Sequence, residues 1–155
     1  MRWSLLWSGP GRSRRPVDLA AIASFVVGGL LLLWSAYVHF HLWDETDGYR
    51  SIATIGPLFL LQSIAGLVIG VGVIAARRLW TALVGVGFVL STLAGFLVSV
   101  THGLFGFKES WLAPFAQQVF GIELAAVVVL GLAATLCLIG SSPRASAGVT
   151  AGPPT

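Results

Sequence analysis

The side chains that could bind a ligand or carry a proton are few, and they fall at a similar depth in the apolar segments. His39, His41 and His102 lie near the ends of two apolar segments, and Gln62 and Glu123 lie near the beginnings of the segments that follow. Glu123 is the only carboxylate well inside one of these segments. A buried ionisable group costs about 3 kcal/mol on membrane-insertion scales and usually faces a partner, a cavity or a site. These five residues form the candidate polar cluster.

Several chemistries fit such a cluster. Histidines with a carboxylate can bind Zn or Cu(II), two histidines on facing helices can hold a haem, and a His–Glu–Tyr set can handle protons or a quinone headgroup. His39 and His41 are two residues apart, so on a helix they point about 200° away from each other and cannot share a ligand. The pattern therefore assigns no cofactor and no metal ligand. Hydrogen bonding of Glu123 to His41 or His102 is the simpler structural interpretation.

Catalytic motifs are missing from the sequence. It contains no Gly-rich phosphate loop, no HExxH and no GxSxG. Cys137 is the only cysteine, which excludes an intrachain disulfide and a cysteine-based metal motif. We therefore expect no catalysis by this chain alone.

The composition of the chain indicates which kind of structure carries these polar side chains. Of 155 residues, 56% are hydrophobic and only 10% are charged, whereas soluble domains carry about 25% charged residues. A hydrocarbon layer about 30 Å thick needs roughly 20 mostly apolar residues per helix, and four stretches qualify. We expect an all-α, four-transmembrane-helix bundle over residues 17–140, with a basic tail over 1–16 and a disordered tail over 141–155. The expected helices are 17–41, 54–76, 79–101 and 114–140.

The flanking charges predict the orientation. Seven basic residues lie in the two tails and the Arg77–Arg78 turn, whereas the two other loops hold only Arg50 and Lys108 against four acidic residues. The positive-inside rule then places both termini in the cytoplasm and the chain in the plasma membrane. Because the cations flank the spans, the net charge of +3 favours contact with lipid headgroups and not with nucleic acid.

Small residues predict a packing seam beside the polar cluster. Gln62, Gly66 and Gly70 are spaced at i, i+4 and i+8, so they share one helix face. The two glycines let two backbones approach closely in lipid. Glu123 and Gly131 repeat the arrangement in the last segment. Such a seam can join helices of one chain or two protomers of a homo-oligomer.

The two helical hairpins could also be a duplication. A parallel repeat of this kind has a pseudo-twofold axis along the membrane normal. The alternative is chance, because apolar sequences align easily. A shift of 61 residues pairs His41 with His102, Gln62 with Glu123, and Gly70 with Gly131.

Several short stretches resemble a group of small four-helix integral membrane proteins of actinobacteria that has no assigned activity. The resemblance spans roughly residues 17–140 and implies a fold and a membrane location only. More distantly, the architecture is similar to that of DoxX-type four-helix membrane proteins, some of which are linked to quinone or redox partners; the chain has no DoxX-specific motif. The stretches are His41-Leu42-Trp43, Gly48-Tyr49-Arg50, Ile55-Gly56-Pro57-Leu58-Phe59-Leu60-Leu61-Gln62 and Gly103-Leu104-Phe105-Gly106-Phe107.

Three functions remain open at the level of sequence. The first is an accessory or scaffolding subunit, or a small-ligand binder, that presents the loops at 42–53 and 102–113 and works alone, as a homo-oligomer or in a membrane protein complex. The second is a redox protein that binds haem, metal or quinone near His41, His102 and Glu123. The third is a small transporter that works as an oligomer.

Overall fold

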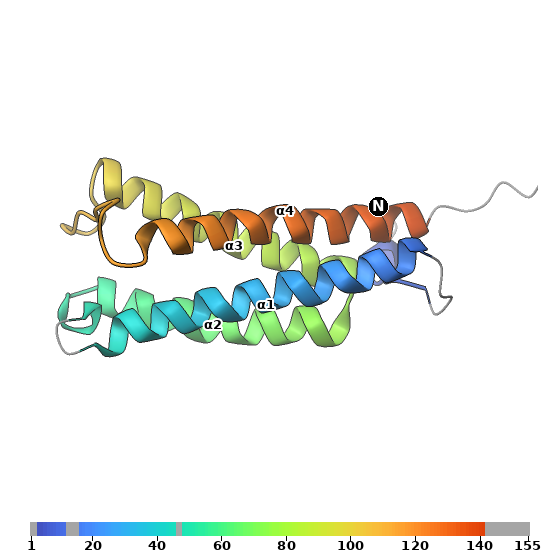
Figure 1. Cartoon of the computed structure of the whole chain (residues 1–155), viewed down its shortest axis with the longest axis horizontal. Coiled ribbons are helices and arrows are strands. Elements are labelled where there is room, and N and C mark those ends of the chain that lie inside the picture. The colour runs from blue at the N-terminus through green and yellow to red at the C-terminus, as the bar shows by residue number, and fades with distance from the viewer. Residues whose placement is uncertain (1–2, 12–15, 46–47, 142–155) are drawn as a thin grey trace, which may run out of the picture.

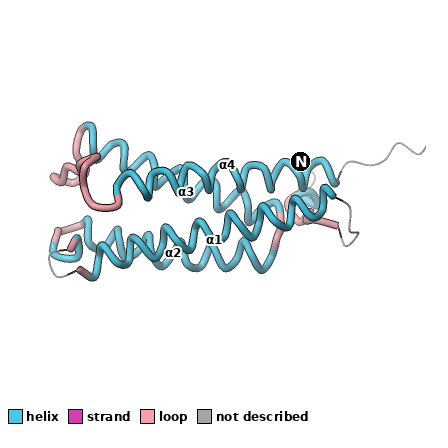
Figure 2. Tube along the Cα trace, viewed as in Figure 1, coloured by secondary structure: helices cyan, strands magenta, loops and turns pink. Residues whose placement is uncertain are grey.

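The expected all-α fold is confirmed. A computed structural model describes residues 3–11, 16–45 and 48–141. Within these ranges the chain forms four long α-helices and no strand, and all four helices are long and apolar enough to cross a membrane (Figures 1 and 2). They are α1 (Pro16–Asp44), α2 (Ile55–Ala76), α3 (Leu79–Thr101) and α4 (Ala116–Gly140), with short 3-10 helices at η1 (Trp3–Leu5) and η2 (Tyr49–Ser51).

The helices run alternately up and down, so the described residues of the connections after α1 (45 and 48–54) and after α3 (102–115) lie together at one end of the bundle (Figure 1). We call this the loop end. The opposite end holds residues 3–11, the α2–α3 turn and the end of α4, and we call it the terminal end. Helix α1 packs most extensively on α2 and α4, and of the four pairs of neighbouring helices α2 and α3 contact each other least. The bundle is therefore most open between α2 and α3.

The core is formed by large apolar side chains from all four helices. Phe25, Leu32, Val73, Val89 and Leu130 are at most 1% exposed. The outward faces are apolar as well, with Leu61 and Val128 more than 60% exposed. A helix that is apolar on all sides suits a lipid environment.

The N-terminal segment at residues 3–11 packs on the α2–α3 turn. The first backbone amides of α3 have no partner within their own helix. The Leu79 amide donates to the Ser8 carbonyl (2.9 Å), and the Trp80 amide donates to the Leu6 carbonyl (3.1 Å). The Arg78 guanidinium also donates to a backbone carbonyl of this segment, that of residue 7 (2.7 Å). The expected N-terminal tail thus caps α3 in its described part.

The helix bounds differ from the expected ones mainly at the loop end. Helix α1 continues three residues past His41, to Asp44, and α4 begins at Ala116 instead of residue 114. Phe115 has a left-handed backbone (φ 62°), so a helix cannot run through it. The tail expected to be disordered at 141–155 lies, except for Ser141, outside the described residues.

Candidate functional site

The structure joins Glu123 to His39 through a serine. Glu123 on α4 is 2% exposed, and its Oε1 accepts a hydrogen bond from Ser35 Oγ on α1 (2.8 Å). His39 lies one turn beyond Ser35 and is 8% exposed. Its Nδ1 lies 2.9 Å from the Ser35 carbonyl oxygen and 3.4 Å from Ser35 Oγ. These three residues form a buried polar chain between α1 and α4.

The other two histidines lie apart from this chain. His41 Nε2 lies 3.1 Å from Glu45 Oε1, and the imidazole stacks on Tyr37. His102 is exposed at the end of α3, where its Nδ1 lies 2.8 Å from Thr101 Oγ1. The predicted hydrogen bond from Glu123 to His41 or His102 was therefore wrong. His41 and His102 lie near the ends of α1 and α3 at the loop end. Glu123 instead contacts Ser35, which lies deeper in the bundle.

No metal cluster is found among the described residues: no three His, Cys, Asp or Glu side chains lie close enough to hold one ion. His39 and His41 lie on different sides of α1, as their spacing requires, with His39 buried and His41 partly exposed.

Gln62 makes a second hydrogen bond between the two hairpins. Its Nε2 donates to Thr92 Oγ1 on α3 (2.8 Å), and Thr92 Oγ1 donates to the Phe88 carbonyl (3.0 Å). The polar residues of both even-numbered helices thus bond to hydroxyls on odd-numbered helices of the opposite hairpin. This relation fits a pseudo-twofold arrangement, although the bonded hydroxyls do not occupy equivalent positions in the proposed repeat.

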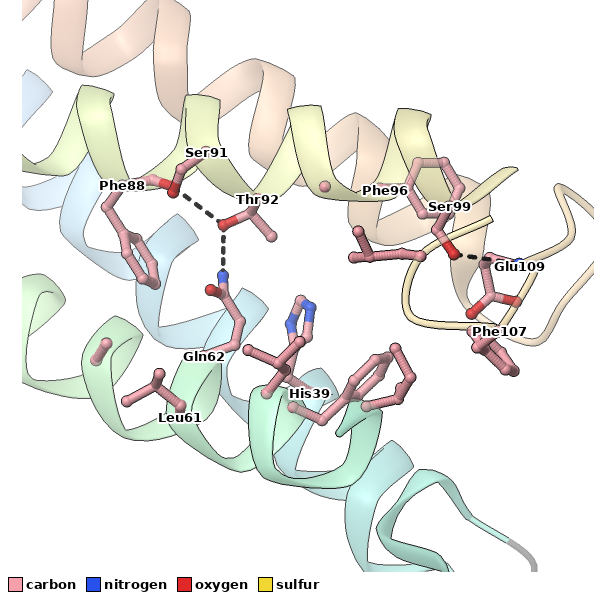
Figure 3. Close-up of a pocket in the computed structure, with 16 residues that line it drawn as sticks. His39, Leu61, Gln62, Phe88, Ser91, Thr92, Phe96, Ser99, Phe107 and Glu109 are labelled. Carbon is pink, nitrogen blue, oxygen red and sulfur yellow. Dashed lines mark hydrogen bonds between the residues drawn. The ribbon is translucent and has the colours of Figure 1, made fainter. Parts of the chain in front are cut away.

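A cleft of about 460 Å³ lies between α2 and α3. Its walls are mostly apolar, and His39 from α1 lies between the two helices with its ring directed toward this space (Figure 3). Six polar side chains interrupt the apolar lining. They are His39, Gln62, Ser91, Thr92, Ser99 and Glu109.

A smaller cavity of about 50 Å³ lies on the α4 side of His39 and is lined by Glu123, Tyr49 and Glu109 among others. Five residues, His39 included, line both spaces. His39 therefore borders both the cleft and the smaller cavity, which the buried carboxylate of Glu123 also lines.

The loop end of the cleft is held by contacts between the two loops. Tyr49 Oη donates to Glu109 Oε2 (2.7 Å), and the Glu109 amide donates to Ser99 Oγ (3.2 Å). The Tyr49 ring stacks on Phe59 (4.1 Å between centroids) and meets Phe107 edge-on. Burial, the hydrogen bond to Glu109 and the negative charges of Glu109 and Glu45 raise the pKa of Tyr49 well above its usual value.

The glycines of the expected seam have different surroundings. A Cβ built on Gly66 would lie 3.1 Å from Ala36 Cβ, and one on Gly70 would lie 3.1 Å from the Gly29 carbonyl oxygen. Both therefore lie in the α1–α2 contact within one chain. A Cβ on Gly131 would meet no atom within 4 Å among its described neighbours, so the seam is not repeated on α4.

Three of the polar residues around His39 were not predicted from the sequence: Ser35, Thr92 and Glu109. The available signal was depth, because Ser35 and Thr92 lie on the odd-numbered helices near the level of Glu123 and Gln62. A hydroxyl in an apolar helix usually bonds its own backbone, which gives it no distinguishing pattern in sequence.

Comparison with known proteins adds no family to this geometry: no protein-family model, no curated protein and no solved structure matches the chain.

Proposed function

We propose that this chain is a multi-pass plasma-membrane protein that binds a small, membrane-dissolved amphiphile in the α2–α3 cleft and catalyses no reaction of its own. The observation that carries the proposal is the cleft itself. Its volume of about 460 Å³ lies in the range of small-molecule sites, roughly 300–1,000 Å³. An apolar lining with a few polar groups is also typical of such sites.

The position of the cleft supports entry from the bilayer. It lies between α2 and α3, which contact each other less than any other pair of neighbouring helices in the bundle. Leu58 and Leu61 line it and are 37% and 61% exposed, so the α2 wall continues onto the outer surface of the bundle. A ligand dissolved in lipid would reach His39 by passing between α2 and α3, without crossing the loops.

The flanking charges support the orientation that goes with this proposal. The described basic residues of the terminal end, Arg77 and Arg78, are both exposed. Under the positive-inside rule this end faces the cytoplasm, and the cleft then opens in the outer half of the bilayer.

The redox alternative centred on His41, His102 and Glu123 gains no support, because these three side chains have separate partners. Transport by an oligomer and a scaffolding role stay predictions of the sequence that no contact in the structure favours.

The test is saturable binding in lipid nanodiscs, with empty nanodiscs as the control for partition into lipid. The probes are 4-heptylphenol and its methyl ether, 4-heptylanisole. The binding of each probe is measured by isothermal titration calorimetry. Gly95 lines the cleft, and a Cβ there meets no atom within 4 Å. Gly95→Leu should therefore fill the cleft without disturbing the helices and weaken binding at least about tenfold.

Gly87→Leu is the matched control. Gly87 lies about two turns away on the same helix, also has no atom within 4 Å of a built Cβ, and does not line the cleft. This variant should bind as the wild type does. Wild-type protein that binds neither probe, or Gly95→Leu protein that binds as tightly as Gly87→Leu, would contradict the proposal.

A further inference from the structure

We infer that the cleft selects ligands whose polar group donates a hydrogen bond, with His39 Nε2 as the acceptor. This inference rests on the proposed function and specifies its ligand: an apolar body that carries an alcohol or phenol hydroxyl.

The tautomer of His39 follows from its partners on Nδ1. The Ser35 carbonyl oxygen, 2.9 Å away, can only accept a hydrogen bond. The Ser35 hydroxyl gives its own hydrogen to Glu123 Oε1 (2.8 Å), so toward Nδ1 it also presents lone pairs. The ring hydrogen of neutral His39 must therefore lie on Nδ1.

Nε2 is then an acceptor. It makes no hydrogen bond within the described part of the chain, and its ring lines the cleft. The serine and the glutamate behind the ring thus fix which nitrogen a ligand meets. We regard Ser35 and Glu123 as positioning residues, since neither hydroxyl nor carboxylate lines the larger space.

The neighbouring groups favour the same ligand. Thr92 Oγ1 and Ser91 Oγ both give their hydrogens to the Phe88 carbonyl, at 3.0 Å and 2.6 Å. Since Thr92 Oγ1 is a donor there, it accepts from Gln62 Nε2, which leaves Gln62 Oε1 and one Nε2 hydrogen available. A ligand hydroxyl can donate to His39 and accept from Gln62.

Ethers, ketones and quinones lack this ability. Their oxygens only accept, so they can bond to the free Nε2 hydrogen of Gln62 but give no hydrogen to His39 Nε2. Binding such a ligand removes water from His39 Nε2 and leaves this acceptor without a partner, which costs free energy. The cleft should therefore discriminate between two ligands of nearly the same shape that differ only in the hydroxyl hydrogen.

The experiment compares 4-heptylphenol with 4-heptylanisole on wild-type protein in nanodiscs at pH 8, after correction for the partition of each into empty nanodiscs. We expect the phenol to bind at least about tenfold more tightly, the ratio that one well-made hydrogen bond supplies. His39→Phe should bring this ratio close to one. His41→Phe, which changes a histidine outside the cleft, should keep it.

The outcomes separate the two proposals. If both probes bind equally and Gly95→Leu weakens both, the ligand-binding function stands and the selectivity is overturned. The selectivity is also overturned if the anisole binds more tightly, or if His39→Phe keeps the tenfold ratio. If neither probe binds, both proposals fail. The wild-type comparison decides the matter even if His39→Phe does not fold.

Discussion

Tyr49 shows how one side chain outside the four long helices closes the loop end of the site. Its ring lies between Phe59 of α2 and Phe107 of the second loop, and its hydroxyl reaches Glu109. A phenol that donates to a carboxylate is stabilised in its protonated form, and burial has the same effect. The contact therefore ties the two loops together over the cleft only while Tyr49 keeps its proton.

Tyr49→Phe should lower the free energy of unfolding by about 1 kcal/mol at pH 8, the usual contribution of one hydrogen bond. The unfolded tyrosine titrates near pH 10, and the folded pKa is higher. The contribution of Tyr49 to the free energy of unfolding is therefore fully present below about pH 10, and it is lost as the pH rises toward the pKa of Tyr49 in the folded protein. The difference between wild type and variant should shrink from pH 9 to pH 11 in detergent unfolding curves.

Tyr37→Phe provides the comparison, since Tyr37 is the only other tyrosine and is 59% exposed. A wild-type minus Tyr49→Phe difference that stays constant over this pH range would show that the hydroxyl of Tyr49 does not hold the loops.

At the scale of elements, the α1–α2 contact depends on small residues. Gly29 and Gly70 face each other so closely that a Cβ on Gly29 would lie 2.9 Å from the Gly70 carbonyl oxygen. Gly66 meets Ala36 one turn farther along. Backbones that approach this closely gain van der Waals contact, which is one of the forces that drive helix association in lipid.

Gly70→Leu should destabilise the folded monomer by about 1–3 kcal/mol, because the larger side chain must displace Leu33 or the α1 backbone. Gly131→Leu, at the position that the proposed repeat pairs with Gly70, should change stability by no more than about 0.5 kcal/mol. Thermal unfolding in mild detergent measures both. If Gly131→Leu destabilises the protein more than Gly70→Leu does, the more important packing seam lies on α4, as in an interface between protomers.

At the scale of the whole molecule, the two hairpins lie closer together at the terminal end than at the loop end (Figure 1). The short turn between α2 and α3, together with residues 3–11, holds these helices together at the terminal end. At the loop end each helix continues into a longer connection, and the hairpins lie farther apart there (Figure 1). The cleft is therefore a consequence of chain connectivity.

Orientation is testable at this scale, because Cys137 is the only cysteine and is 2% exposed. Ser51 at the loop end and Ser4 at the terminal end are both exposed. In intact cells a membrane-impermeant maleimide should label Ser51→Cys protein, and it should label Ser4→Cys protein only after permeabilisation. The reverse labelling pattern would show that the loop end faces the cytoplasm, and the cleft would then open in the inner half of the bilayer.

Local composition and residue spacing alone predict the four helices and which side chains share a helix face. The thickness of a bilayer sets how long an apolar run must be, so four helices and their approximate bounds follow from local composition. The separation of His39 from His41 follows from helical geometry. So does the placement of Gln62, Gly66 and Gly70 on one face of α2, which the structure turns toward α1 and α3.

Only the tertiary structure decided which polar groups meet. Each helix is apolar on nearly every side, so nothing local fixes its rotation about its own axis, and Glu123 could have faced several partners. Packing of all four helices turns it to Ser35, brings His39 and not His41 inward, and leaves a space between α2 and α3. Local spacing therefore determined the membrane-spanning architecture of this chain, whereas the candidate site exists only because four distant segments pack together.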